Sequence, residues 1–247
     1  MKCCLQQSYK LQPFYNLSLL PQRSSVGVTV CRGFIYAIGG YDGSTRVCLK
    51  SGERYHPGFD EWQPISSLIA RRSGPAIVTK EQRQIYAIGG HDGRIVRKSV
   101  EIYDITRDRW HRVADMHIAR RNAVAEAAYD KIYVLGGDDS QHELNSIEVY
   151  DPKADQWSML PCKLSEPTSY AGLVLVDNST LDQIEKSLDE VDQNEESRSF
   201  DRGMERLRQS NRSNVSICLI KKPRSTDLVI KTHYLINVIY VLFFFNF

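Results

Sequence analysis

The stretch Ile35-Tyr36-Ala37-Ile38-Gly39-Gly40 occurs again as Ile85-Tyr86-Ala87-Ile88-Gly89-Gly90. A third version, Ile132-Tyr133-Val134-Leu135-Gly136-Gly137, follows later in the chain. The first glycines of successive copies are 50 residues apart (39 to 89) and then 47 residues apart (89 to 136). A period of this size predicts an internal repeat with one supersecondary unit per copy.

Each copy is followed by a tyrosine and, seven residues later, by a tryptophan. These pairs use all three tryptophans of the chain: Tyr55/Trp62, Tyr103/Trp110 and Tyr150/Trp157. An arginine-containing turn precedes each copy, at Arg23-Ser24, Arg72-Ser73 and Arg121-Asn122. Because aromatic side chains bury large apolar areas, their fixed spacing predicts that each unit packs through them.

Each unit is expected to form four short strands, here named A to D in chain order. In the second unit these are residues 76–79, 84–88, 99–103 and 110–114. β-branched and aromatic residues bounded by glycine and aspartate turns favour strands over helices. One four-stranded sheet cannot bury both of its faces, whereas sheets stacked face to face can. The sequence therefore predicts an all-β fold of stacked sheets, a β-propeller.

The double glycine, the tyrosine and the spaced tryptophan resemble the kelch motif over residues 21–177. Motifs such as Gly89-Gly90-His91-Asp92-Gly93 and Arg120-Arg121-Asn122-Ala123 are similar to the BTB-kelch (kelch-like, ring-canal kelch) family, and closest to kelch-like proteins 2 and 3. The resemblance implies a six-bladed propeller preceded by BTB and BACK domains that bind cullin-3. It also implies that the propeller holds the substrate of a cullin-3 RING E3 ubiquitin ligase.

The chain departs from that family in its extent. We expect a non-repeat segment (1–20), three repeats (21–71, 72–118 and 119–165), a closing strand (166–177) and a tail (178–247). Residues 1–20 are too short for a BTB or BACK domain, and propellers have about four to eight blades. We therefore expect a partial propeller: three four-stranded blades and one closing-type strand. Its open blade faces favour self-association. A truncated product that is non-functional, or that competes with a full-length relative, is an alternative.

The tail does not continue the repeat. From Leu181 to Asn214, fifteen of thirty-four residues are charged, which favours disorder, with a helical stripe over 181–191 as the alternative. The apolar segment 234–247 has fourteen residues, fewer than the roughly 20 that span a bilayer, so membrane insertion is not favoured. A tail anchor and an aberrant C-terminus both stay open.

Composition excludes several functions. The net charge of +2 gives no global field for nucleic acid. The six cysteines contain no Cys-x-x-Cys pair, and the histidines occupy unrelated repeat positions, so we expect no metal, no cofactor and no catalytic residue. The N-terminus lacks the apolar run of a signal peptide, so we expect a cytoplasmic protein.

Strand order predicts where a partner binds. In an up-and-down blade, the loops from strand D to the next strand A and from B to C lie at the same end. These loops contain nine Lys or Arg against five Asp or Glu, and arginine pairs with carboxylates in bidentate fashion. The resemblance implies that this end binds an acidic peptide of the substrate. The candidate residues are Arg23, Ser24, Arg46, Arg72, Ser73, His91, Arg94, Arg97, Arg121 and Asn122.

Two departures and two alternatives accompany this prediction. Thr168 stands where the family has arginine before Ser169, and Glu143 stands where Arg46 and Arg97 occur in the other repeats. Arg72 and Arg121 have a structural alternative, in which they bond carbonyls or a glutamate such as Glu53, Glu101 or Glu148. The functional alternative is a cytoskeleton-associated protein that binds actin through its flat sides or its tail.

Overall fold

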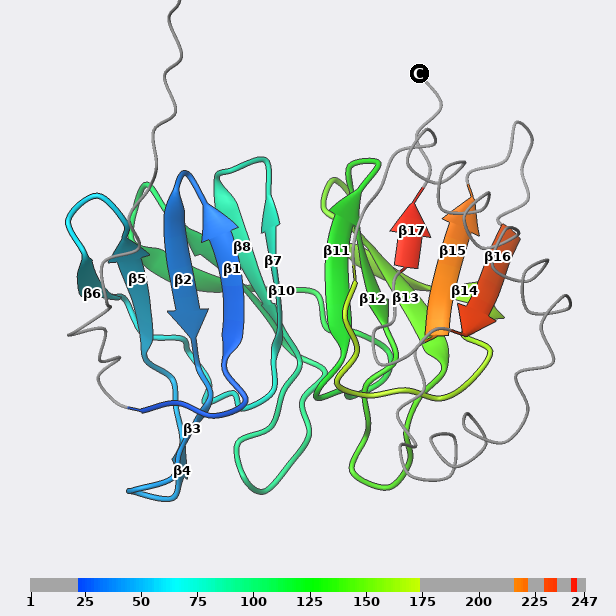
Figure 1. Cartoon of the computed structure of the whole chain (residues 1–247), viewed down its shortest axis with the longest axis horizontal. Helices are drawn as coiled ribbons and strands as arrows, with labels where there is room; N and C mark the ends of the chain where they lie inside the picture. Colours follow the sequence, from blue (N-terminus) through cyan, green and yellow to red (C-terminus); the bar gives the residue numbers. More distant parts are fainter. Residues whose placement is uncertain (1–21, 174–215, 222–228, 235–240, 244–247) are drawn as a thin grey trace, which may run out of the picture.

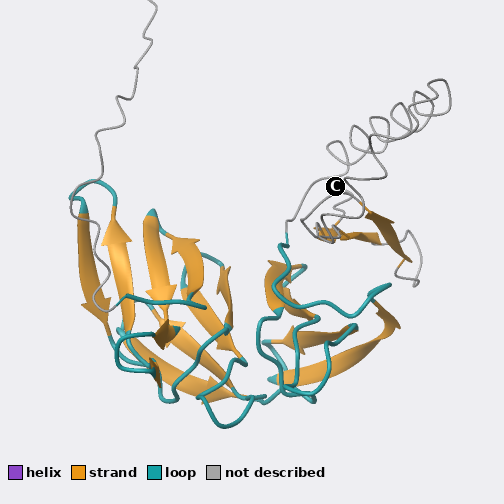
Figure 2. Ribbon diagram, turned by 60° about the horizontal axis from the view of Figure 1, so that its bottom comes forward, coloured by secondary structure: helices purple, strands orange, loops and turns teal. Residues whose placement is uncertain are grey.

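The computed structural model describes residues 22–173 and the backbone of strands at 216–221, 229–234 and 241–243. Over these residues the fold is all-β, with no helix. Three four-stranded antiparallel sheets follow one another along the chain and stand side by side in an arc (Figures 1 and 2). The predicted all-β fold of kelch-type blades is confirmed. The described part contains no helix with the length and hydrophobicity needed to cross a membrane.

The three sheets, here called blades 1 to 3, have their strands in chain order from the inside of the arc outward. Blade 1 contains β1 (Gly27–Cys31), β2 (Phe34–Ile38), β5 (Gly52–His56) and β6 (Glu61–Ile65). Blade 2 contains β7 (Ala76–Lys80), β8 (Gln84–Ile88), β9 (Val100–Asp104) and β10 (Arg109–Val113). Blade 3 contains β11 (Val124–Ala128), β12 (Lys131–Leu135), β13 (Ser146–Asp151) and β14 (Gln156–Lys163). A small hairpin, β3 (Tyr41–Asp42) and β4 (Val47–Cys48), extends from blade 1.

Strand register explains the tyrosine-to-tryptophan spacing. The two residues are cross-strand partners on the outer two strands of each blade, as in Tyr103↔Trp110 of β9 and β10. Their ring centroids lie 5.3, 5.1 and 5.0 Å apart in blades 1, 2 and 3. Cross-strand aromatic pairs of this kind stabilise a sheet and offer a broad apolar face to the next one.

Two hydrophobic clusters fill the seams between blades. Tyr36 and Trp110 belong to the cluster between blades 1 and 2, and Tyr86 and Trp157 to that between blades 2 and 3. Trp110 and Trp157 are each 8% exposed, and their indole N–H groups donate to backbone carbonyls of the preceding blade's outgoing loop, at 2.8 and 2.9 Å. Trp62 is on the open side of blade 1 and half-buried, and its buried Nε1 has no hydrogen-bond partner among the described residues. The tryptophans therefore attach each blade to the one before it.

The double glycine connects each blade to the next loop. Gly89 has φ +64°, and a Cβ there would lie 2.1 Å from the carbonyl oxygen of Arg120. The next residue, Gly90, donates its N–H to that same carbonyl at 2.7 Å. Only glycine tolerates both the positive φ and this close backbone approach.

The region after blade 3 is described only in part. Residues 169–173 contain no strand, and residues 174–177 lie outside the described part. The inter-blade hydrogen bonds nevertheless continue, since Gly137 donates to Thr168 O at 2.7 Å and Tyr170 N donates to Asn122 O at 3.0 Å. The chain therefore reaches the start of a fourth inner strand, whose remaining positions lie outside the described residues, so the expected closing strand stays a prediction.

Part of the expected tail has regular structure. β15 (Ser216–Lys221) pairs antiparallel with β16 (Val229–Tyr234) and parallel with β17 (Val241–Phe243). These segments differ from the expectation of disorder, and they are rich in the apolar and β-branched residues that favour strands. The helical alternative over 181–191 falls outside the described residues.

Candidate functional site

Two sets of loops form one end of the molecule, which we call the loop rim. They are the loops that enter each blade (residues 22–26, 66–75 and 114–123) and the loops between the second and third main strands (39–51, 89–99 and 136–145). Backbone bridges join one loop of each set at Ser24↔Tyr41, Ser73↔His91 and Arg121↔Asp138. The hairpin of β3 and β4 marks this end at the bottom of Figure 1. The predicted convergence of the two loop sets is therefore present.

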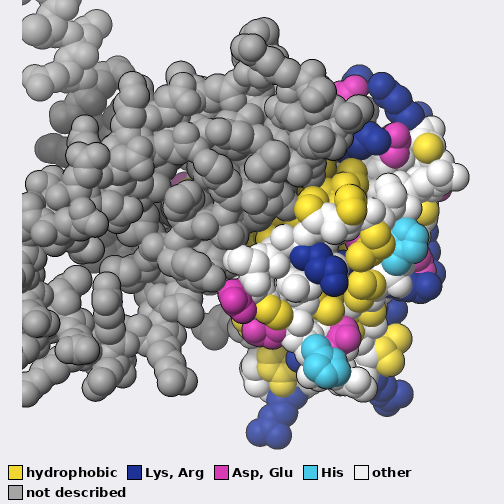
Figure 3. Space-filling model, turned by 90° about the vertical axis from the view of Figure 1, so that its right-hand side faces the viewer, with side chains coloured by type: hydrophobic (Ala, Val, Ile, Leu, Met, Phe, Trp, Pro, Cys, Tyr) yellow, Lys and Arg dark blue, Asp and Glu magenta, His cyan; other side chains and the backbone are white. Residues whose placement is uncertain are grey.

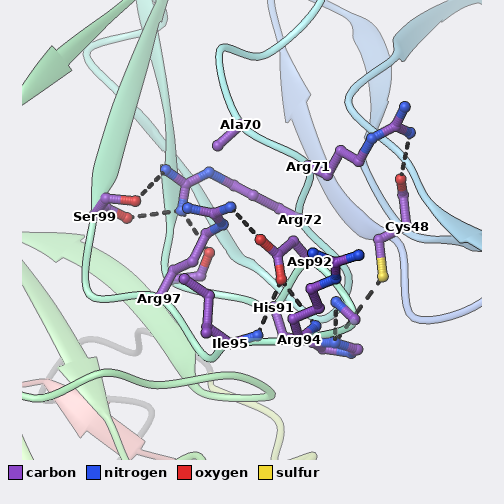
Figure 4. A network of polar contacts seen from close by, with 12 residues as sticks. Cys48, Ala70, Arg71, Arg72, His91, Asp92, Arg94, Ile95, Arg97 and Ser99 are labelled. Carbon is purple, nitrogen blue, oxygen red and sulfur yellow. Dashed lines mark hydrogen bonds and ion pairs between the residues drawn. The ribbon is translucent and has the colours of Figure 1, made fainter.

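Arg72 is an internal residue of the rim (Figure 4). Its side chain and that of Glu101 are both 0% exposed, with Nη2 and Oε1 2.9 Å apart. The guanidinium also donates from Nη1 to Gly89 O at 2.6 Å and to Ser99 O at 2.7 Å, and from Nη2 to Ser99 Oγ at 2.9 Å. Burial lowers the pKa of Arg72, and the Glu101 carboxylate opposes that shift. The structural alternative for Arg72 is therefore the arrangement observed.

The same arrangement recurs in the other blades and corrects the alignment of the repeats. Arg23 pairs with Glu53 at 2.9 Å, and Arg120 pairs with Glu148 at 3.0 Å, both arginine side chains being 0% exposed. The structural equivalents are thus Arg23, Arg72 and Arg120, whereas the sequence alignment placed Arg121 in this series. Because Arg120 and Arg121 are adjacent, an alignment that is wrong by one residue still places an arginine at this position.

The paired glutamates also hold the preceding loop. Glu101 accepts the N–H groups of Ile69 and Ala70 at 2.6 and 3.0 Å. Glu148 accepts those of His117 and Ile118 at 2.7 and 3.1 Å. We call each arginine–glutamate pair with these backbone bonds a blade clamp.

Three candidates are consequently unable to present their side chains to a partner. Arg72 is a clamp residue and Arg23 pairs with Glu53, and neither side chain has exposed surface. Ser73 is only 2% exposed, and its backbone pairs with that of His91. These three contact-residue predictions are corrected, because their polar groups are engaged inside the fold.

The exposed cations gather where blades 1 and 2 meet. Arg46 lies at the tip of the β3–β4 hairpin with φ +57°, and Arg94 lies in the 89–99 loop. Arg71 is exposed and donates from Nη1 to Cys48 O at 2.8 Å, which ties the two loop sets together. Arg71 was not among the candidate contact residues, although it stands beside Arg72. Lys50 and Lys98 are also exposed, and the sequence interpretation did not select them either.

Arg97 is a half-buried cation with an internal partner. Its Nη2 lies 2.5 Å from Asp92 Oδ2. Asp92 Oδ1 accepts the N–H groups of Arg94 and Ile95 at 2.9 and 3.0 Å, so it also shapes the turn. Backbone hydrogen bonding, first from Ile95, lowers the pKa of Asp92 and keeps it ionised.

His91 and Cys48 meet across the seam, with Nδ1 and Sγ 4.0 Å apart (Figure 4). His91 Nδ1 accepts the N–H of Gly93 at 3.1 Å. Burial lowers the pKa of His91 and raises that of Cys48, so both groups favour their neutral forms. A neutral thiol is a poor nucleophile. Within the described residues, no group of three or more His, Cys, Asp or Glu is placed to hold a metal ion.

On blade 3 the candidate residues have partners within the rim. Arg121 Nε lies 2.7 Å from Asp138 Oδ1, and its side chain is 32% exposed. Asn122 Nδ2 donates to the other oxygen of Asp138 at 3.0 Å. Glu143 accepts the hydroxyl of Ser169 at 2.6 Å. The backbone bridges make Glu143 the counterpart of Val96, so the predicted equivalence with Arg97 is wrong by one residue. On blade 1, Ser24 is exposed and its hydroxyl donates to Tyr41 O at 3.3 Å.

Comparison with known proteins agrees with these blades. The Kelch motif model matches residues 22–69, 71–117 and 119–164. The chain is similar to kelch repeat-containing protein kel-10 of Caenorhabditis elegans, with 37% identity over 90 residues, or 36% of this chain and 15% of the relative. Kelch-like protein 38 of Mus musculus is 34% identical over 98 residues, or 38% and 16% of the two chains. Kelch repeat and BTB domain-containing protein 1 of cowpox virus is 32% identical over 103 residues, or 41% and 18%.

The matched part of this chain thus spans less than a fifth of each of these relatives. A particular closeness to kelch-like proteins 2 and 3 stays a prediction. The three Kelch matches cover more than half of the 247 residues and coincide with the three blades. On this basis the chain belongs to the Kelch-repeat family, whose repeats form protein-interaction scaffolds.

Proposed function

We propose that this chain is a protein-interaction module whose loop rim binds an acidic segment of a partner protein. The observation that carries the proposal is the group of exposed cations at the seam of blades 1 and 2. Arg46, Arg71 and Arg94 present guanidinium groups that no carboxylate of the described residues pairs with. Arginine binds carboxylates through two parallel hydrogen bonds, so such a group suits glutamate or aspartate side chains.

The blade clamps support this proposal indirectly. Because Arg23, Arg72 and Arg120 are used internally, the loops that carry the exposed arginines are held by buried ion pairs and backbone bonds. A site on rigid supports loses less conformational entropy when a partner binds. Arg97 adds a cation whose bond to Asp92 an incoming carboxylate can replace.

We further propose that the partner is a ubiquitylation target, and that the chain corresponds to the target-recognition part of a cullin-3 adaptor. The support is the resemblance to BTB-kelch proteins and the similarity to the cowpox virus protein, which is named as containing a BTB domain. In this proposal cullin-3 is contacted through BTB and BACK domains and not through the blades. The division into repeats at 21–71, 72–118 and 119–165 is part of the same proposal. An actin-binding role is the competing proposal.

Fluorescence anisotropy with the full chain tests peptide binding. The probe is a fluorescein-labelled peptide of alternating glutamate and glycine, and the control probe has glutamine in place of glutamate. We expect Arg46→Glu/Arg94→Glu to abolish binding of the glutamate peptide. The control variant Arg83→Glu reverses an exposed charge in the loop between β7 and β8, at the opposite end, and should bind normally. Equal binding of both peptides, or equal loss in both variants, would refute the proposed site. Cosedimentation with actin filaments, if it occurs and is unaffected by Arg46→Glu/Arg94→Glu, would favour the cytoskeletal alternative.

A second candidate function, self-association, is favoured by the open face of blade 1. Val28 and Val30 of β1 are 55% and 56% exposed, and the buried Nε1 of Trp62 has no hydrogen-bond partner among the described residues. Exposed apolar sheet faces are sites of association. Sedimentation velocity of the full chain should show oligomers that Val28→Lys/Val30→Lys reduces. A concentration-independent monomer would remove this candidate.

A further inference from the structure

The charge of the loop rim changes sign along the arc. In the rim loops of blades 1 and 2 (22–26, 39–51, 66–75 and 89–99) the exposed charged residues are all basic: Arg46, Lys50, Arg71, Arg94 and Lys98. The carboxylates there are occupied, since Asp42 accepts the hydroxyls of Ser44 and Thr45 at 2.6 Å each, and Asp92 pairs with Arg97. This part of the rim therefore has a surplus of exposed positive charge.

Blade 3 has the opposite balance. Its rim loops carry the acidic residues Asp115, Asp138, Asp139 and Glu143 against the basic residues Arg120 and Arg121, and Arg120 is buried against Glu148. Next to the rim, at the end of β14 and just after it, lie Lys163 and Glu166. Arg121 is already neutralised by Asp138. Backbone N–H groups, first that of His142, lower the pKa of Asp139, so that this carboxylate stays ionised. Glu143 and Glu166 are exposed.

The change of sign arises at equivalent positions of the repeats. Ser73 and His91 form the backbone bridge on blade 2, and Arg121 and Asp138 form it on blade 3. Further into the loop, the uncharged Gln141 of blade 3 stands at the position of Arg94 in blade 2, and Ser140 stands at the position of Gly93. The loop of blade 3 thus loses cations and gains acids without a change in backbone pairing.

We propose that the loop rim recognises a segment of dipolar charge, with an acidic stretch over the seam of blades 1 and 2 and a basic stretch over blade 3. This inference rests on the proposed function and adds a direction and a second charge requirement to it. A uniformly acidic segment long enough to cross the arc would place carboxylates against Glu143 and Glu166. Like charges in apposition weaken binding and exclude wrong partners and wrong orientations.

The arrangement of the blades makes the two regions distinguishable to a ligand. Blades 1 and 3 stand at opposite ends of the described arc, with blade 2 between them (Figures 1 and 2). Exposed charges interact over a Debye length of about 10 Å at 0.1 M salt, so each region acts mainly on the part of the ligand above it. Figure 3 shows the end of the molecule beyond blade 3, where acidic, basic and hydrophobic side chains mix beside residues that are not described.

The test uses the full chain and three fluorescein-labelled peptides of equal length. One is all-acidic with glycine spacers, one has an acidic half followed by a lysine half, and one alternates glutamate and lysine in the same total composition as the second. We expect the block peptide to bind at least about fivefold more tightly than the alternating one at low salt, and the difference to vanish near 1 M salt.

Two variants separate the regions. Glu143→Lys should strengthen binding of the all-acidic peptide and remove the preference for the block peptide over the alternating one. Arg94→Glu should weaken both the all-acidic and the block peptide by about fivefold. The matched control, Arg83→Glu, should leave all three affinities unchanged. Circular dichroism of each variant confirms that the fold is kept.

The outcomes distinguish this inference from the proposed function. If none of the peptides binds, both are overturned. If the all-acidic peptide binds and responds to Arg94→Glu, but block and alternating peptides bind equally, the proposed function stands and the dipolar inference falls. Failure of Glu143→Lys to raise the affinity for the all-acidic peptide overturns the inference in the same way.

Discussion

Replacing Arg72 with alanine should destabilise the protein far more than replacing its neighbour Arg71. The guanidinium of Arg72 makes bonds to Gly89 O, Ser99 O, Ser99 Oγ and Glu101, all of them in the interior of blade 2. Alanine leaves the two carbonyls without this donor and leaves the Glu101 carboxylate, which is 0% exposed, without its counter-ion. Arg71 is exposed, and its guanidinium donates to Cys48 O.

The magnitude follows from the burial of the pair. Removing one partner of a buried ion pair costs about 3–5 kcal/mol, because the remaining charge is desolvated and unpaired. An exposed residue such as Arg71 should cost about 0.5 kcal/mol or less. For a chain of this size, the Arg72→Ala effect corresponds to a fall in melting temperature of about 6–20 °C.

Urea and thermal unfolding of the full chain, followed by circular dichroism and tryptophan fluorescence, provide the assay. Arg71→Ala is the control for loss of a positive charge at the rim. Arg120→Ala should reproduce the Arg72→Ala effect, because Glu148 is equally buried. A cost below about 1 kcal/mol for Arg72→Ala, or equal costs for Arg71→Ala and Arg72→Ala, would refute the clamp. Charge reversal at Arg72 is accordingly a test of folding and not of partner binding.

Three further predictions concern stability. Gly89→Ala should lower the free energy of unfolding by more than about 2 kcal/mol, because the added Cβ would meet Arg120 O. Gly33→Ala should lower it by only about 1 kcal/mol, the strain of φ +77°, because the added Cβ would enter open space. Similar losses in the two variants would contradict the clash at Gly89. Trp110→Phe should lower the free energy of unfolding by about 1 kcal/mol more than Trp62→Phe, because of these two tryptophans only Trp110 donates to a carbonyl. Equal urea midpoints for the two variants would count against the inter-blade bond. The hydroxyls of Ser44 and Thr45 lower the pKa of Asp42 to about 2, below its unfolded value of about 3.9, so its contribution is present above about pH 4 and is lost as the pH falls toward about 2. Asp42→Asn should therefore show a smaller drop in urea midpoint between about pH 5 and about pH 3 than the unchanged chain, and an unaltered drop would disprove this assignment.

The strands were predictable because period, turn residues and β-propensity agree at each repeat. The expected strands of the second unit, 76–79, 84–88, 99–103 and 110–114, lie within a residue of β7 to β10. The inter-blade position of Trp110 and Trp157 also follows from the sequence, because no other arrangement buries one large aromatic pair per sheet. Trp62 does not follow this pattern, because it lies on the open side of blade 1, where none of the described blades packs against it.

The roles of the individual arginines could not be predicted from the sequence. Whether an arginine enters the interior depends on a glutamate about thirty residues away, such as Glu101 for Arg72, and on two carbonyls that only the folded blade brings together. The adjacent pair Arg120-Arg121 made two registers equally consistent with the pattern. Counting back from the double glycine would have helped, because Arg23 and Arg120 stand 16 residues and Arg72 stands 17 residues before the first glycine, whereas Arg121 stands only 15 before it.

Adjacent residues of the rim have different roles, one inside the fold and one at the surface. This explains how the surface charge of the rim can change while the fold is kept. Each clamp needs a buried arginine, and the side chains of Arg23, Arg72 and Arg120 have no exposed surface for a partner to contact. The positions after each of these arginines hold Ser24, Ser73 and Arg121, whose backbones bridge to Tyr41, His91 and Asp138, and of these three Ser73 is buried. These positions share their backbone bridges, so their side chains can vary while the pairing is kept. The exchange of serine and histidine for an arginine–aspartate pair on blade 3 alters the charge of the rim and leaves the clamp of Arg120 and Glu148 intact.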